Sequence, residues 1–405
     1  MSGSWWGRES LRYLLPAVVC LVALIPIYVH SHYGHGDIDL YHRYAWAFLT
    51  RRSLPWEYPV LAVLPFLLAL PTVGDYIVIY ALGMVVLFVA GYVAIHRFAS
   101  PRAANLYAVY IVLGGAITAL ARFDLVPALV TVAALFAASK RRFTLAYVLL
   151  ALGVLLKLYP LFLLPILMIE HRRVLHFRGG SLLPAPVLRG GGVFGLTVAL
   201  GFLFAIALQP GGWWWPFVTL SNRPLEVESI PATLLWLTSF AGGSAVPDHS
   251  FHSFNLVGSA AGAVSILGTV GLIAGCLFVY RRQYRGRIDI GRAFLAVVCV
   301  AIVTSKVLSP QYLVWALPLV AMIEGFSLTW IAICVLTTLV YPILFELDQL
   351  HGIGVPSRYS AHFLGVIAVR NALLLVASWR AAVPRVDRQA AVSQDSEPDQ
   401  IPEYA

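Results

Sequence analysis

Two carboxylates, Asp37 and Asp39, are separated by a single residue in the segment HGDIDLYHRYA (35–45), shortly after the first long apolar segment. In a partly dehydrated cleft, a carboxylate can remove a proton from an attacking hydroxyl and so act as a general base. The opposing interpretation is a solvated loop whose acids cap an interfacial helix, DLYHRYAWAFLTRR. Because Gly36 lets the backbone turn before that helix, we predict Asp37 as the base and Asp39 as the cap.

Three cations without basic neighbours lie at the ends of apolar segments. They are Lys157 in LLKLYP, Lys306 in SKVLSPQY and Arg122 in ARFD. A single charge close to hydrocarbon is costly, and one interpretation is that each side chain snorkels to the membrane surface. Three such cations on one face indicate instead an anion site, in which point charges and a guanidinium fork hold the phosphate of a lipid substrate.

Other polar and aromatic side chains belong to the same expected loops. Asp124 can pair with Arg122, or join Asp37 and Asp39 as an oxygen ligand of a divalent cation; we predict a site without a metal or another cofactor. The WWWP segment (213–216) is typical of an interfacial belt, and sugar or prenyl stacking is the alternative. The further residues expected near the cleft are Asp39, Tyr41, Tyr58, Asp124, Tyr159, Arg223, Glu228, Gln311 and Tyr312.

The composition indicates which elements must position these residues. Sixty per cent of the 405 residues are apolar and 12% are charged, which is typical of a polytopic membrane protein. The net charge of +9 comes largely from short loops, HRFASPR (96–102), KRR (140–142), EHRR (170–173) and RRQYRGR (281–287), so the positive-inside rule explains it without nucleic acid. The four cysteines lie in apolar segments without a CxxC pair, so the sequence implies no disulfide framework and no zinc site of the usual spacing.

The apolar segments predict an all-α fold with about 12 transmembrane helices and both ends in the cytoplasm. These segments are 11–29, 75–95, 103–121, 125–139, 143–157, 159–169, 190–208, 254–280, 290–305, 312–323, 327–345 and 363–379. The stretch YPVLAVLPFLLALP (58–71) has three prolines and is short, so we expect it to be interfacial or embedded within the first outer loop, 30–74. We expect one domain, 1–380, with a second large outer loop at 209–253, and a disordered cytoplasmic tail, 381–405.

A set of motifs in a fixed order resembles a known family. The segments are GDIDLYHRYA, WEYPVL, RFDLVPAL, LLKLYPLFLLP, LEVESIPA and KVLSPQYLVWALPL, within about residues 30 to 320. They resemble the family 87 membrane glycosyltransferases of the C-type superfamily, whose characterised relatives are polyprenol-phosphate-mannose-dependent α-mannosyltransferases. This chain departs from the family pattern where Tyr58 and Pro59 are followed by Val60 instead of a second proline.

The resemblance implies an inverting hexosyltransferase, and mannose is the first sugar that it suggests. Its partners would be a polyprenyl-phosphate sugar donor, a lipid or glycan acceptor and membrane lipids, at the outer face of a bacterial cytoplasmic membrane. The family acid in the first outer loop corresponds to Asp37, because the family acid precedes an apolar-Tyr pattern that Ile38 to Tyr41 continue. A transporter or flippase that moves a lipid phosphate without chemistry is the alternative, although no internal repeat supports it.

Overall fold

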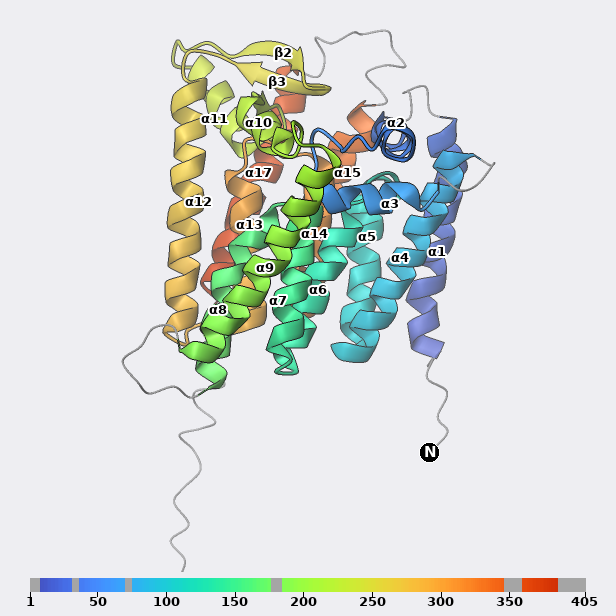
Figure 1. Cartoon of the computed structure of the whole chain (residues 1–405). Coiled ribbons are helices and arrows are strands. Elements are labelled where there is room, and N and C mark those ends of the chain that lie inside the picture. Colours follow the sequence, from blue (N-terminus) through green and yellow to red (C-terminus); the bar gives the residue numbers. More distant parts are fainter. Residues whose placement is uncertain (1–7, 31–35, 70–74, 176–183, 346–358, 385–405) are drawn as a thin grey trace, which may run out of the picture.

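The chain forms a bundle of helices that run side by side, with shorter elements across one end (Figure 1). The computed structural model describes residues 8–30, 36–69, 75–175, 184–345 and 359–384. Within them, six helices are long and apolar enough to cross a membrane, as in a multi-pass membrane protein. They are α1 (Arg8–Val29), α4 (Tyr76–Phe98), α5 (Pro101–Ala121), α9 (Ala185–Leu208), α12 (Ala261–Tyr284) and α17 (Ala361–Ala382).

Shorter helices complete the bundle. They are α6 (Leu125–Ser139), α7 (Phe143–Leu156), α8 (Leu164–Val174), α13 (Ile290–Thr304), α14 (Leu313–Ile323) and α15 (Leu328–Thr338). Single turns precede or extend three of them, namely η2 (Tyr159–Leu163), η3 (Pro310–Tyr312) and η4 (Leu339–Leu344). A helix therefore lies at each of the expected apolar segments, while the number that cross the bilayer stays a prediction.

Short elements of the two large loops lie across the end that we call the upper end, after its place in Figure 1. They are α2 (Gly36–Arg51), η1 (Val60–Ala62), α3 (Val63–Leu67), α10 (Trp215–Asn222) and α11 (Ile230–Ser239). As expected, the proline-containing stretch does not form a spanning helix over its described residues; its end, 70–71, lies outside them. The described residues of the first large loop, 36–69, thus form a structured layer over the bundle.

The expectation of an all-α fold was wrong at the upper end, where three strands form a small antiparallel sheet. β1 (Leu225–Glu226), β2 (Val246–Ser250) and β3 (Ser253–Val257) pair in the order β1-β3-β2. Phe251 and His252 join β2 to β3 with positive φ angles of 54° each, as a tight hairpin turn requires. The apolar residues of β3 had extended the predicted segment 254–280 too far toward the N-terminus, and α12 begins only at Ala261.

The core consists of aromatic and small side chains between closely packed helices. Trp330, Tyr107 and Phe88 are fully buried in the main cluster. A Cβ added to Gly114 of α5 would lie 2.8 Å from the backbone Cα of Cys334 in α15, so only glycine allows this approach. Lipid tails are as apolar as the core, so close van der Waals packing of this kind holds membrane helices together.

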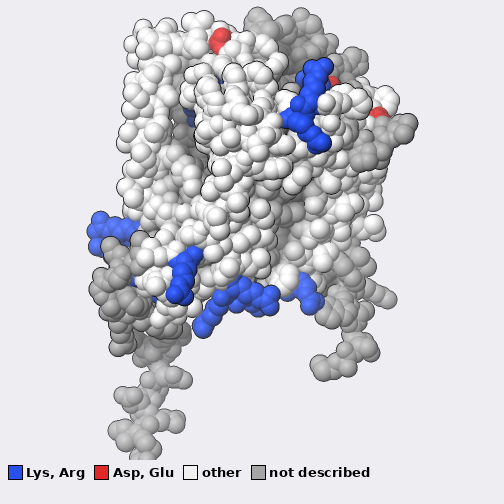
Figure 2. Space-filling model, in the orientation of Figure 1, with Lys and Arg blue, Asp and Glu red and all other residues white. Residues whose placement is uncertain are grey.

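The basic loops gather at the end opposite the short elements, which we call the basic end. Figure 2 shows most of the visible Lys and Arg there, with a smaller group over α2. The loops 96–102, 140–142 and 281–287 each connect two helices at this end, and 170–173 lies at the end of α8. They therefore share one face, as the sequence predicts, and the cytoplasmic assignment of that face stays a prediction.

The C-terminal boundary differs slightly from the predicted one. Helix α17 continues to Ala382, so the first two residues of the expected tail, 381–382, are helical. Residues 385–405 lie outside the described residues.

We predict that the upper end faces away from the cytoplasm. In a variant that lacks the four native cysteines, Asn222→Cys should react with a membrane-impermeant thiol reagent added outside intact cells, because Asn222 is exposed at the end of α10. Lys140→Cys, at the basic end, should react only after the membrane is opened. The opposite pattern of labelling would reverse the orientation.

Candidate functional site

An aromatic cluster fixes the first large loop onto the bundle. Tyr41 of α2 is buried and stacks on Phe66 of α3, with ring centroids 4.2 Å apart. Tyr41 also meets Phe123 edge-on at 5.8 Å and Tyr58 at 6.0 Å. Such ring contacts are worth about 0.5–1.5 kcal/mol each beyond burial. The cluster therefore holds the start of α2 next to the turn between α5 and α6.

Asp37 forms an ion pair with Arg122 at this position. Arg122 follows α5 with an extended backbone, and both side chains keep partial exposure, 18% for Arg122 and 26% for Asp37. The prediction that Asp37 precedes the helix and Asp39 caps it was wrong, because both lie in the first turn of α2. Two positions apart on a helix, they point to nearly opposite sides, and Asp39 lies within electrostatic range of Tyr28 in α1.

A second ion pair lies deeper, between Lys157 and Asp124. Their Nζ and Oδ1 atoms are 2.6 Å apart, and Trp315 Nε1 donates to the same oxygen at 2.6 Å. The other carboxylate oxygen, Oδ2, is buried and has no hydrogen-bond partner among the described residues. The Lys157 ammonium also lies 4.8–5.5 Å from the ring centroids of Phe123, Tyr58, Tyr312 and Trp315. The prediction that Asp124 can pair with Arg122 was therefore wrong, because Asp124 pairs with Lys157.

Two of the expected tyrosines support Trp315. Tyr159 and Tyr312 stack on it with ring centroids 4.3 and 4.1 Å away. The Tyr159 hydroxyl is further bonded to Thr131 Oγ1 at 2.9 Å. Their part in the site is thus to hold the indole that donates to Asp124.

A second group of charged residues comes from the 209–253 loop and the loop after α13. Lys306 Nζ donates to the Ser221 carbonyl at 2.7 Å, and Ser309 Oγ donates to Glu226 Oε1 at 2.5 Å. Burial, and after it the charge of Arg223, lowers the pKa of Lys306. Within the described residues, neither Lys306 nor Arg223 forms an ion pair. Arg223 Nε, Glu226 Oε2 and Gln311 Oε1 are buried without hydrogen-bond partners among those residues.

Glu228, expected near the cleft, instead belongs to a buried network with α17. Its Oε2 lies 2.7 Å from Arg370 Nη1, and both side chains are at most 4% exposed. Asn371 Nδ2 donates to the Glu228 carbonyl at 3.1 Å and to Thr233 Oγ1 at 2.8 Å. Burial raises the pKa of Glu228 to about 7, against the lowering effect of Arg370. This arrangement ties the loop to the bundle.

We therefore predict that Glu228→Gln affects stability more than chemistry. Removal of one partner of a buried ion pair costs about 3–5 kcal/mol, because the other charge stays buried and unpaired. The melting temperature in detergent should fall, while activity per folded molecule stays unchanged. Glu170→Gln is the matched control, since its partner Arg173 is 54% exposed and 3.9 Å away. Equal melting temperatures for the two variants would contradict the prediction.

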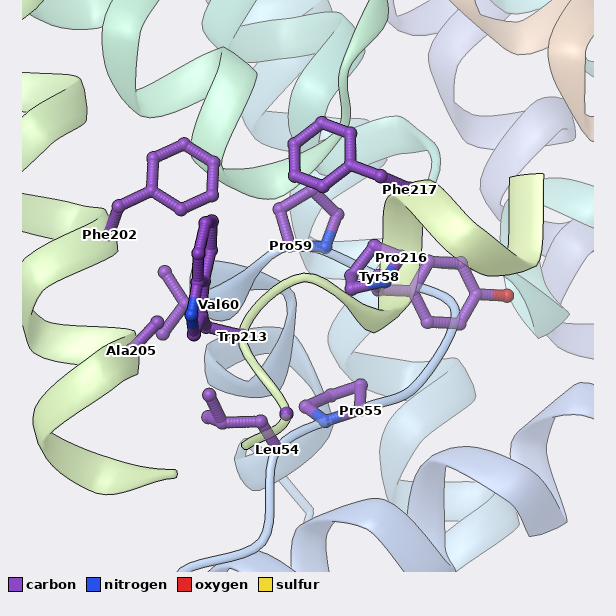
Figure 3. A pocket seen from close by; sticks show the side chains of 11 residues that line it. Leu54, Pro55, Tyr58, Pro59, Val60, Phe202, Ala205, Trp213, Pro216 and Phe217 are labelled. Atoms are coloured by element: carbon purple, nitrogen blue, oxygen red, sulfur yellow. The ribbon is translucent and has the colours of Figure 1, made fainter. Parts of the chain in front are cut away.

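An apolar pocket lies between the first large loop, the end of α9 and the start of α10 (Figure 3). Phe202, Trp213 and Phe217 contribute rings, and Phe202 lies 5.9 Å from each of the other two. Figure 3 shows the Tyr58 hydroxyl directed away from Phe202 and Trp213. Trp215, in contrast, packs on Trp56 at 4.4 Å and does not line the pocket. Trp213 and Trp215 therefore have different surroundings, which the pattern WWWP could not indicate.

A divalent cation bound by Asp37, Asp39 and Asp124 would require their three carboxylates to converge, and the structure does not bring them together. No three His, Cys, Asp or Glu side chains of the described residues converge in a way that would suit a metal ion. Asp124 Oδ1 is already engaged by Lys157 and Trp315.

Comparisons with known proteins leave the family open. No protein-family model matches this chain, and no curated protein matches it in sequence. Among solved structures, the chain is similar to the apo oligosaccharyltransferase of Archaeoglobus fulgidus, with 14% identity and a TM-score of 0.38. That likeness covers 98% of this chain and 59% of the other, so this chain spans little more than half the length of that protein.

Proposed function

We propose that this protein transfers a hexose, mannose first of all, from a polyprenyl-phosphate sugar to a lipid or glycan acceptor. The observation that carries the proposal is a carboxylate, Asp37, held by Arg122 at the upper end, where a second group of cations, Lys306 and Arg223, has no ion-pair partner among the described residues. A phosphate leaving group needs positive charge, and an acceptor hydroxyl needs a base. The motif resemblance supports the same donor class.

In the proposed reaction, Asp37 takes the proton of the acceptor hydroxyl. The hydroxyl oxygen attacks the anomeric carbon on the side opposite the phosphate, the bond from that carbon to the phosphate oxygen breaks, and polyprenyl phosphate leaves with the electron pair. The anomeric configuration inverts. Arg122 orients the Asp37 carboxylate through their ion pair.

We assign the donor phosphate to Lys306 and Arg223. The sequence predicted Lys157, Lys306 and Arg122 for this role, but Lys157 and Arg122 each face a carboxylate that offsets their charge. Burial first, and the charge of Arg223 after it, lowers the pKa of Lys306, and a bound anion would favour the charged form of this lysine. Lys157 then serves to hold Asp124 and Trp315 in place.

The apolar sides of α9 and α12 are suited to the prenyl chain, whereas the aromatic pocket has a volume of only about 10 Å³ and does not hold one. The pocket is lined mainly by apolar and aromatic side chains (Figure 3). Figure 2 shows a hollow between α12 and the upper part of α9, and both helices are only 11% buried over their apolar windows. A lipid-linked donor could reach the cations through such an opening in the side of the bundle.

We predict that Lys306→Met weakens donor binding and slows transfer. Methionine keeps much of the apolar stem but removes a charge that would act on both the bound phosphate and the leaving group. We expect kcat/KM for the donor to fall about tenfold or more, with a higher KM. Lys140→Met, at the basic end, is the control, and an unchanged kcat/KM in the Lys306 variant would exclude this assignment.

The donor class is tested with purified protein and two radiolabelled donors. A polyprenyl-phosphate mannose should give a new labelled product with a membrane lipid extract, and a nucleotide-linked mannose should give none. A flippase would move the labelled lipid across a vesicle membrane and leave it chemically unchanged. Product from the nucleotide sugar alone would overturn the proposal.

A further inference from the structure

A buried carboxylate lies beside the cations that we assign to the donor phosphate. Glu226 is 8% exposed, and its backbone N–H donates to the Lys306 carbonyl at 2.9 Å, so β1 keeps the carboxylate close to the loop after α13. Ser309 Oγ donates to one carboxylate oxygen, Oε1, at 2.5 Å. The other oxygen, Oε2, is buried and has no hydrogen-bond partner among the described residues. The reaction proposed above does not use this carboxylate.

Two further polar atoms of this region are buried. One is Oε1 of Gln311, which lies in η3, two residues after Ser309. The other is Nε of Arg223, three residues before Glu226. Neither atom has a hydrogen-bond partner within the described part of the chain. Tyr312, next to Gln311, lies within electrostatic range of both Arg223 and Glu226, so the two loops present these polar atoms in one region.

These atoms are suited to a neutral group that carries hydroxyls. A buried acceptor without a donor is costly, and a hydroxyl can both donate to a carboxylate oxygen and accept from a guanidinium N–H. An anion placed against Oε2 would be repelled by Glu226 itself, and a cation placed there would be repelled by Lys306 and Arg223. The sugar of a phosphate-linked donor is a neutral group of this kind, and it is joined directly to the phosphate that the two cations would hold.

We propose that Glu226 recognises the sugar of the donor, by accepting a hydrogen bond from one sugar hydroxyl at Oε2. This inference rests on the proposed function, because it places the sugar next to the cations assigned to its phosphate. Within the described residues Glu226 forms no ion pair with either cation, so its carboxylate is available to the sugar. A site that accepts a hydrogen bond from a substrate hydroxyl rejects an analogue that lacks it, because the buried acceptor is then left unpaired.

The first test compares the binding of two lipids, polyprenyl-phosphate mannose and polyprenyl phosphate, to the full-length protein in nanodiscs. Glu226→Met keeps the length of the side chain but removes the acceptor and its negative charge. The preference for the mannose-carrying lipid should shrink about tenfold or more. The affinity for polyprenyl phosphate should stay equal or rise, because a negative charge near the phosphate is lost. A role of Glu226 in folding alone would weaken the binding of both lipids.

The second test uses the four monodeoxy analogues of the mannose-carrying lipid, which lack the hydroxyl at position 2, 3, 4 or 6. The wild-type protein should bind at least one analogue about tenfold more weakly than the parent lipid. For one such analogue this difference should disappear in Glu226→Met. Asp75→Asn is the control, since Asp75 caps α4 elsewhere in the structure and asparagine can also cap; it should keep every wild-type difference.

Equal binding of the parent lipid and all four analogues by the wild-type protein would overturn the inference, even if the Glu226 variant failed to fold. A folded Glu226→Met protein that keeps every wild-type difference would also overturn it. Binding is measured without turnover, so a protein that discriminates the sugar but transfers none would contradict the proposed reaction alone. A wild-type protein that does not bind the mannose-carrying lipid would overturn the proposed donor and this inference together.

Discussion

Asp37→Asn should lower sugar transfer by about 100-fold or more, because asparagine keeps the shape of the side chain but cannot accept the hydroxyl proton. Donor binding should be nearly unchanged, since the phosphate is assigned to Lys306 and Arg223. The measurement is the initial rate of transfer per folded molecule, together with donor affinity. The loss of the ion pair with Arg122 is a second consequence of the change, so the folded fraction must be determined first.

Asp39→Asn is the matched control for this variant. It lies in the same first turn of α2 but on nearly the opposite side, and we expect at most a modest loss of rate. If Asp39→Asn is inactive while Asp37→Asn keeps near-normal turnover, the base is Asp39. If both variants stay active, this segment does not supply the base.

Lys157→Met should destabilise the protein by about 3–5 kcal/mol, because it leaves the Asp124 carboxylate buried without its cation. Asp124 is 1% exposed, so water cannot replace the missing partner. Transfer activity should fall together with stability. Trp315 would lose the Lys157 ammonium beside its ring, and the Asp124 carboxylate to which it donates would no longer be held in place. The measurement is the melting temperature in detergent with transfer activity on the same samples.

The double variant Lys157→Met/Asp124→Asn separates a supporting pair from a phosphate-binding lysine. Removal of both charges should recover a large part of the lost stability, because no uncompensated charge remains. If Lys157 only supports the site, transfer activity should recover in parallel. If stability returns while kcat/KM for the donor stays low, Lys157 contacts the donor phosphate, as the sequence first predicted.

The helices could be predicted from the sequence because each is a long apolar segment that ends in a charged or proline-containing loop. The small sheet could not be predicted in the same way. The strand residues Phe254, Leu256 and Val257 are as apolar as a helix interior. The hairpin also depends on positive φ angles at Phe251 and His252, and phenylalanine is a residue type that does not favour them.

The charged residues of the site could be found individually, but their pairing could not. Arg122 and Asp124 are two positions apart, yet Arg122 has an extended backbone and Asp124 a helical one, so their side chains reach different partners. Trp315 was missed because it lies within an apolar segment. Its signal was the position three residues after Tyr312, which puts both rings on one side of a helical turn.

Glu226 was also missed, although it lies two residues before the predicted Glu228. Glu226 lies in the short strand β1, and its carboxylate accepts a hydrogen bond from Ser309, near Arg223 and Lys306. Glu228 follows the strand and instead pairs with Arg370 in α17. Such a division depends on contacts across more than eighty residues of sequence, which a local pattern does not contain.

The most direct test of the proposed reaction follows both halves of one donor molecule. Polyprenyl-phosphate mannose labelled with tritium in the sugar and carbon-14 in the prenyl chain is incubated with purified protein and acceptor lipid extract. We predict equal molar amounts of tritiated product and carbon-14 polyprenyl phosphate, both lost in Asp37→Asn. A donor that keeps both labels in one molecule while the folded wild-type protein binds it would contradict sugar transfer and favour transport.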